Sequence, residues 1–164
     1  MEQQEDSTIT KEEAEYAITS LIKKFNTAAR QRSLLGVEKA ENYNNYFDYI
    51  QELRARLSTA LYIYTTEFFK DLSDAKMRLE LELDIMESQK YIYYEDYLMH
   101  EENGGYSKSQ ADSKARKMTK TDEEYIDLRQ RCNDAVSEFY SAHYLKDTVK
   151  ETLNSMSNYK DVWF

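Results

Sequence analysis

The apolar positions in the central part of the chain repeat about every eleven residues. Between residues 37 and 102 the sequence contains neither proline nor glycine. The steps from one apolar position to the next run three, four and four, which is about 3.67 residues per turn and close to the α-helical pitch. We therefore predict one long, unbroken helix over residues 37–102. Its apolar stripe comprises Ile50, Leu53, Leu57, Leu61, Tyr64, Phe68, Leu72, Ala75, Leu79, Leu83, Met86, Tyr94 and Tyr97.

Three capping signals predict the remaining helices. In a capping box, a Ser or Thr and a Glu or Gln three residues later satisfy each other's backbone amides at a helix start. Such boxes begin at Thr10, Ser107 and Thr121. They predict helices over residues 11–35, 108–118 and 122–157. Gly36 is suited to end the first of these, since glycine adopts the left-handed conformation without penalty.

The order of these elements predicts an all-α fold. The helix 122–157 is long enough to lie antiparallel against residues 64–97, across a turn at Asn103-Gly104-Gly105. We expect an elongated antiparallel helical hairpin or bundle with one very long central helix and coiled-coil-like packing. Residues 10–158 would form a single helical domain between a polar tail (1–9) and an apolar C-terminal tag (159–164).

A helix of the predicted length cannot be covered on all sides by one small chain. At ~1.5 Å per residue, residues 37–102 would extend roughly 100 Å. We therefore expect a homo-oligomer or a place in a larger protein assembly. The tag residues would then plug a groove of a neighbouring molecule. These candidate partner-binding residues are Tyr159, Val162, Trp163 and Phe164.

Little in the sequence predicts catalysis. The two histidines, His100 and His143, have no paired metal-ligand spacing, and no phosphate-binding or calcium-binding loop is present. Cys132 lies on the apolar stripe of the last helix, where a buried, inert thiol is the expected state. We expect a protein that is not an enzyme, with no catalytic residue, metal, cofactor or small-molecule substrate. The N-terminus lacks the features of a signal peptide, and no apolar run is long enough to span a membrane.

The charges are distributed unevenly in a chain whose net charge is −9. An acidic arm (residues 78–102) precedes a basic tip (residues 107–120), which has five bases and one acid. One interpretation is internal neutralisation between the arm and the tip. The other is that the tip contacts the phosphates of single-stranded nucleic acid. The candidate nucleic-acid-binding residues are Lys90, Lys108, Lys114, Arg116, Lys117 and Lys120.

The layout of residues 75–159 resembles the UvsY-type recombination mediators of tailed phages. The resemblance lies in the K-Y-I-Y-Y run (Lys90–Tyr94), the Gly104-Gly105 tip, the basic segment after it, D-E-E-Y (Asp122–Tyr125) and the N-S-M-S-N-Y ending (Asn154–Tyr159). It implies a non-enzymatic phage oligomer that binds single-stranded DNA and helps to load a recombinase.

Three functions stay open on the sequence alone. The first is a single-stranded-DNA-binding recombination accessory protein, and the second is a structural subunit of a phage particle or connector. The third is an acidic inhibitor that mimics DNA and blocks a host protein, which the net charge and the acidic arm favour. The expected location is the cytoplasm of the host cell or the virion.

Overall fold

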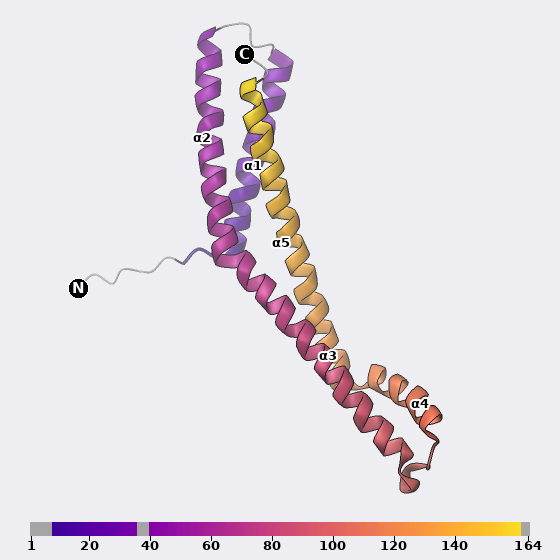
Figure 1. The fold of residues 1–164 in the computed structure, drawn as a ribbon. Coiled ribbons are helices and arrows are strands. Elements are labelled where there is room, and N and C mark those ends of the chain that lie inside the picture. The colour runs from indigo at the N-terminus through magenta and orange to yellow at the C-terminus, as the bar shows by residue number, and fades with distance from the viewer. Residues whose placement is uncertain (1–7, 36–39, 162–164) are drawn as a thin grey trace, which may run out of the picture. The chain divides into compact units, whose positions relative to one another are not determined.

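The computed structural model describes the backbone of residues 8–35 and 40–161, with side chains described over 8–30 and 46–157. This part of the chain forms α-helices, one π-helical turn and one 3₁₀ turn, with short connections between them. It contains no strand, which confirms the all-α class (Figure 1). The elements are α1 (Lys11–Leu35), α2 (Ala40–Tyr64), the π-helical turn η1 (Thr65–Phe69), α3 (Lys70–Met99), the 3₁₀ turn η2 (Glu101–Asn103), α4 (Lys108–Thr121) and α5 (Glu123–Asp161).

The residues predicted as one long helix are helical from Ala40 to Met99. One π-helical turn, η1, interrupts the α-helical hydrogen-bonding pattern, while its flanking residues Tyr64 and Lys70 keep α-helical backbone angles. An eleven-residue repeat drifts by about 20° per repeat on an ideal α-helix. A π-helical turn accommodates one extra residue in the helix. The resulting change in the direction of the later side chains is larger than this drift. The helix ends three residues earlier than predicted, because His100 has an extended backbone.

Contacts divide the chain into two compact units. Unit 1 comprises the residues up to 70 and those from 142 onward, and unit 2 comprises residues 71–141. The helices α3 and α5 contribute residues to both units. The division by contacts does not test the expectation of a single helical domain over residues 10–158, which stays a prediction.

The core of unit 1 lies where α1 packs against α2. It buries Ile18 and Phe25 of α1 together with the predicted stripe positions Ile50, Leu53 and Leu57 of α2. Tyr64 is also fully buried and its hydroxyl donates to Glu15, 3.1 Å away. Burial and the nearby carboxylate raise the pKa of Tyr64 above its usual value.

The core of unit 2 has two parts. Leu79 of α3 packs with Leu128 and Cys132 of α5, and this confirms the sequence reading of Cys132 as a buried residue. Burial raises the pKa of the Cys132 thiol. In the second part, Leu98 of α3 packs against Ala111 and Ala115 of α4, with tyrosines and Met118 around them.

The predicted apolar stripe is wrong at its last position. Tyr97 is 44% exposed, whereas the next residue, Leu98, is only 7% exposed. The ring of Tyr97 stacks on that of Tyr93 instead of entering the core. The reason is that α4 packs on the side of α3 that carries Leu98, and a pattern read from α3 alone cannot indicate that neighbour.

Two of the three predicted capping boxes are confirmed. Thr10 and Glu13 exchange hydrogen bonds of 3.0 and 3.2 Å, and Ser107 does the same with Gln110. The third is wrong, because α4 continues to Thr121, whose hydroxyl donates back to the carbonyl of Lys117. Asp122 caps α5 in its place.

Candidate functional site

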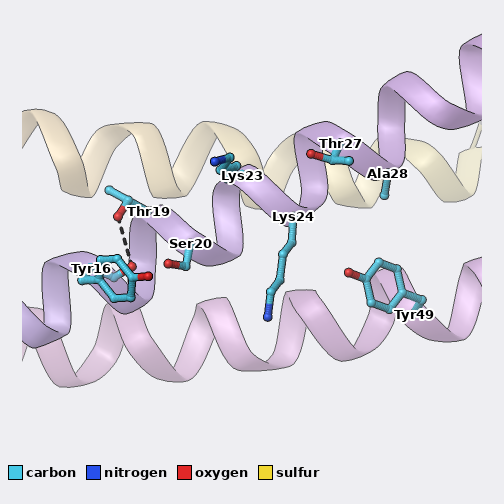
Figure 2. Close-up of a pocket in the computed structure, with 8 residues that line it drawn as sticks. All are labelled: Tyr16, Thr19, Ser20, Lys23, Lys24, Thr27, Ala28 and Tyr49. Carbon is cyan, nitrogen blue, oxygen red and sulfur yellow. Dashed lines mark hydrogen bonds between the residues drawn. The ribbon is translucent and has the colours of Figure 1, made fainter.

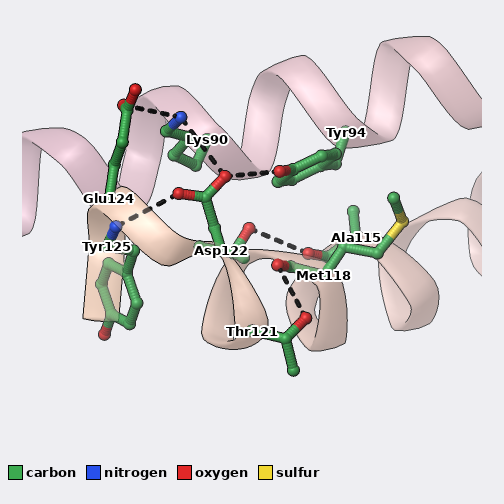
Figure 3. A network of polar contacts seen from close by, with 9 residues as sticks. Lys90, Tyr94, Ala115, Met118, Thr121, Asp122, Glu124 and Tyr125 are labelled. Atoms are coloured by element: carbon green, nitrogen blue, oxygen red, sulfur yellow. Dashed lines mark hydrogen bonds and ion pairs between the residues drawn. The ribbon is translucent and has the colours of Figure 1, made fainter. Parts of the chain in front are cut away.

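Asp122 links the start of α5 to two side chains of α3 (Figure 3). Its carboxylate accepts the backbone N–H of Tyr125 at 3.1 Å and the hydroxyl of Tyr94. Nζ of Lys90 lies 3.3 Å from the same carboxylate and 2.9 Å from that of Glu124. The side chain of Asp122 is only 9% exposed, so these partners replace water around its charge.

The pKa values at this junction follow from its hydrogen bonds. The Tyr94 hydroxyl, the Tyr125 amide and Lys90 hold the pKa of Asp122 below its usual range. Glu124 and then Asp122 raise the pKa of Lys90. Both shifts favour the charged forms of the two groups, as in a structural ion pair.

A second polar cluster joins α3 to α4. The Tyr91 hydroxyl contacts the carboxylates of Glu95 and Asp112. Nε of Arg116 lies 3.3 Å from Asp112, and its guanidinium group lies 5.2 Å from the centre of the Tyr91 ring. The Tyr91 hydroxyl and Arg116 lower the pKa of Asp112. Next to this cluster is a cavity of about 310 Å³, lined by polar residues that include Ser88, Arg116 and Lys120.

Three of the six predicted nucleic-acid-binding residues make ion-pair or cation–π contacts with other described residues. Lys90 and Arg116 neutralise nearby acids, and Nζ of Lys114 lies 4.1 Å from the centre of the Tyr106 ring. Lys90 pairs with acids at the start of α5 and Arg116 pairs with an acid of α4, so these contacts do not test neutralisation between the acidic arm and the basic tip. Lys108, Lys117 and Lys120 are exposed on α4 and form no ion pair within residues 8–30 and 46–157.

The predicted C-terminal tag falls mostly outside the described residues. The backbone of Tyr159 belongs to α5, but its side chain is not described. Val162, Trp163 and Phe164 lie outside the described part of the chain. Their role as a plug for a neighbouring molecule stays a prediction.

A row of exposed apolar side chains on α3 was missed by the sequence analysis. Met77, Leu81, Ile85 and Ile92 are 64%, 61%, 47% and 65% exposed. Their spacing of four, four and seven residues places them along one face of a helix. We call these four residues the α3 row. This spacing is visible in the sequence, but the eleven-residue repeat predicts only the apolar face that contains Leu79 and Leu83.

Acidic side chains flank the α3 row. Asp74 and Asp84 lie three residues before Met77 and three after Leu81, which places them beside the row on the helix surface. Both are exposed, and neither forms an ion pair with another described residue. Beside Ile85, a groove of about 410 Å³ between α3 and α5 has Met86 and Leu128 among its lining residues, with Glu82, Glu124 and Asp127.

A second groove, of about 490 Å³, lies between α1 and α2 in unit 1 (Figure 2). Tyr16 and Tyr49 contribute exposed aromatic rings to it, whereas its lining residue Ala28 is buried. Lys23 and Lys24 are its charged residues. We call this the α1–α2 groove. It combines apolar surface with positive charge, whereas the α3 row combines apolar surface with negative charge.

No group of three or more His, Cys, Asp or Glu side chains that could hold a metal ion occurs within the described residues. Within the same residues, no helix is sufficiently long and apolar to cross a membrane. The chain matches no protein-family model, no curated protein and no solved structure in the comparisons. The resemblance to the UvsY-type mediators therefore stays an expectation from the sequence layout.

Proposed function

We propose that this chain is a non-enzymatic helical interaction protein that assembles into an oligomer through the α3 row. The observation that carries the proposal is the exposure of four large aliphatic side chains on one face of one helix. Isolated exposed apolar residues are normal on protein surfaces, but a contiguous apolar strip typically marks a binding surface.

Burial of the row would supply part of the free energy that a specific contact needs. Complete burial of one such side chain contributes about 1.5–3 kcal/mol, and about half of each is still exposed. Covering the four residues would therefore contribute roughly 3–6 kcal/mol before the cost of association is subtracted. The grooves and charges around the row would have to contribute the remainder.

The proposed scaffold is an antiparallel helical hairpin with coiled-coil-like packing in unit 2. The order of contacts supports it, since Leu79 packs with Cys132 whereas Lys90 pairs with Asp122. Residues farther along α3 therefore contact residues nearer the start of α5, as expected for two antiparallel helices. Two paired helices leave their outer faces uncovered, and a third helix from another molecule would cover the α3 row.

The proposal is tested by the mass of the protein in solution. We expect the wild-type chain to be oligomeric by sedimentation or light scattering, and the Leu81→Asp/Ile85→Asp variant to be monomeric because charge opposes burial of the row. Asn133→Asp, at an exposed position of α5, is the control for added negative charge and should keep the wild-type mass. A monomeric wild-type chain at all concentrations would refute the proposal.

A second candidate function is binding of single-stranded nucleic acid by α4. Its specific support is the exposure of Lys108, Lys117 and Lys120 without ion pairs among the described residues. The recombination-accessory role and the phage origin rest on the resemblance alone.

Salt titration of a labelled oligothymidine tests this candidate. Affinity should fall steeply with salt, and replacing the three lysines by glutamine should flatten the slope by up to about 2, at ~0.7 per phosphate contact on a single strand. Lys150→Gln, at an exposed position of α5, is the control and should change neither affinity nor slope. No binding by the wild-type chain at low salt would exclude the candidate.

A further inference from the structure

We infer that the partner of the α3 row is the α1–α2 groove of a second copy of this chain. The inference rests on the proposed self-association and adds which two surfaces meet. It makes the interface heterologous, meaning that two different patches of the same protein face each other.

A contact between two α3 rows is opposed by their charge. Residues 71–87 contain six acids and only two bases, Lys76 and Arg78. Both bases are already paired on the same helix, with Glu80 and Glu82. Two rows placed together would bring the unpaired carboxylates of Asp74 and Asp84 toward another acidic surface. Like charges across an interface oppose association, so the row requires a basic partner.

The chain carries such a basic surface on α1, where Lys23, Lys24 and Arg30 are exposed. The sequence has no acid between residues 16 and 35, although the net charge of the chain is −9. Lys23 and Lys24 are exposed and have no ion pair among the described residues. Figure 2 shows Lys24 extended from α1 toward α2, with Tyr16 and Tyr49 on either side of it. The charges of these lysines are thus available to an incoming acidic helix.

The two surfaces also match in chemistry and length. The exposed rings of Tyr16 and Tyr49 offer apolar contact to aliphatic side chains. The groove is lined over residues 16–28, which is about 18 Å of helix, and the row from Met77 to Ile92 spans about 23 Å. A helix seated in the groove would bury the row while Asp84 pairs with the lysines at the rim.

A heterologous contact has a consequence that a symmetric one lacks. Each copy that uses its row still has a free groove, and each copy that uses its groove still has a free row. Such contacts form closed rings or continue into filaments. Two variants that each lack one of the surfaces should therefore complement each other, and their assembly should stop at a dimer.

The test uses two variants of the full chain. The groove variant is Lys23→Glu/Lys24→Glu, and the row variant is Leu81→Asp/Ile85→Asp. Each should be monomeric alone, with a dissociation constant raised by about tenfold or more, because each removes charge or apolar complementarity. An equimolar mixture should form a dimer that contains one copy of each. Arg54→Glu/Lys150→Glu carries the same change in charge outside the groove and should assemble like the wild-type chain.

The outcomes separate this inference from the proposed function. If the wild-type chain and the groove variant assemble equally well, the inference is overturned and the proposed function stands. If the two variants do not dimerise when mixed, although circular dichroism shows them to be folded, the heterologous interface is also overturned. If the groove variant keeps its mass but loses binding of a twenty-nucleotide oligothymidine, the groove is a nucleic-acid site and the inference fails. A wild-type chain that is monomeric at all concentrations would refute both the proposed self-association and this inference.

Discussion

Replacing Asp122 by alanine should lower the free energy of unfolding by about 2–4 kcal/mol. Loss of a helix N-cap costs roughly 1 kcal/mol, and loss of the Tyr94 hydrogen bond to the charged carboxylate costs about 1.5–3 kcal/mol more, whereas Lys90 keeps its ion pair with Glu124. Asp122 provides the cap of α5 through the Tyr125 amide and accepts hydrogen bonds from Tyr94 and Lys90. Urea denaturation at neutral pH, followed by circular dichroism, measures the change.

Asp122→Asn separates the cap from the charge. Asparagine caps helices about as well as aspartate, so this variant should lose only the interactions that need a carboxylate. The folded-state pKa of Asp122 is depressed below 3.8, so its stabilisation is present above about pH 4 and is lost as the pH falls through the depressed value. Stability of the variant should therefore depend less on pH below 4. An acid-side profile that matches the wild-type chain would contradict this role of the charge.

Leu57→Ala should be comparably destabilising, by about 2–5 kcal/mol, because it leaves a cavity in a packed core. Leu57 is fully buried in unit 1 on the predicted stripe of α2. Urea denaturation of this variant reports the loss directly.

Ile126→Ala is the comparison for Leu57→Ala, because Ile126 is an aliphatic residue of α5 that remains half exposed. It should cost less than about 1 kcal/mol, since the truncated atoms are already partly in water. Equal losses in the two variants would show that the burial of Leu57 in unit 1 does not govern stability.

Local signals in the sequence predicted helix starts and turns well where the deciding atoms are near in the chain. The capping box at Thr10 and the turn at Gly104-Gly105 are of this kind, and both glycines have the positive φ that the turn requires. The prediction of a capping box at Thr121 is wrong because Thr121 and Asp122 are both residues that commonly cap helices. Which one caps is decided by where α4 ends, and that depends on packing against α3.

The candidate site was harder to predict, because charge composition does not indicate pairing. The sequence identified Lys90 and Arg116 as cations, but the partner of Lys90 is on α5, far along the chain. Nor can composition distinguish them from Lys117, which is exposed on α4. The α3 row was accessible to sequence reasoning, since a helix with two apolar faces can contact two partners, but only the exposure of Met77 and Leu81 reveals the second face.

The π-helical turn η1 marks a place where the chain can absorb a change in its length. No residue from Thr65 to Phe69 is fully buried, although Phe68 and Phe69 are half-buried and lie against the rings of Tyr64 and His143. Removing one residue there would restore a regular α-helix and keep the later positions of α3 on their present faces, whereas removing one residue from a regular stretch of α3 would rotate every later position by about 100°. A single deletion within η1 should thus be tolerated better than a single deletion within α3.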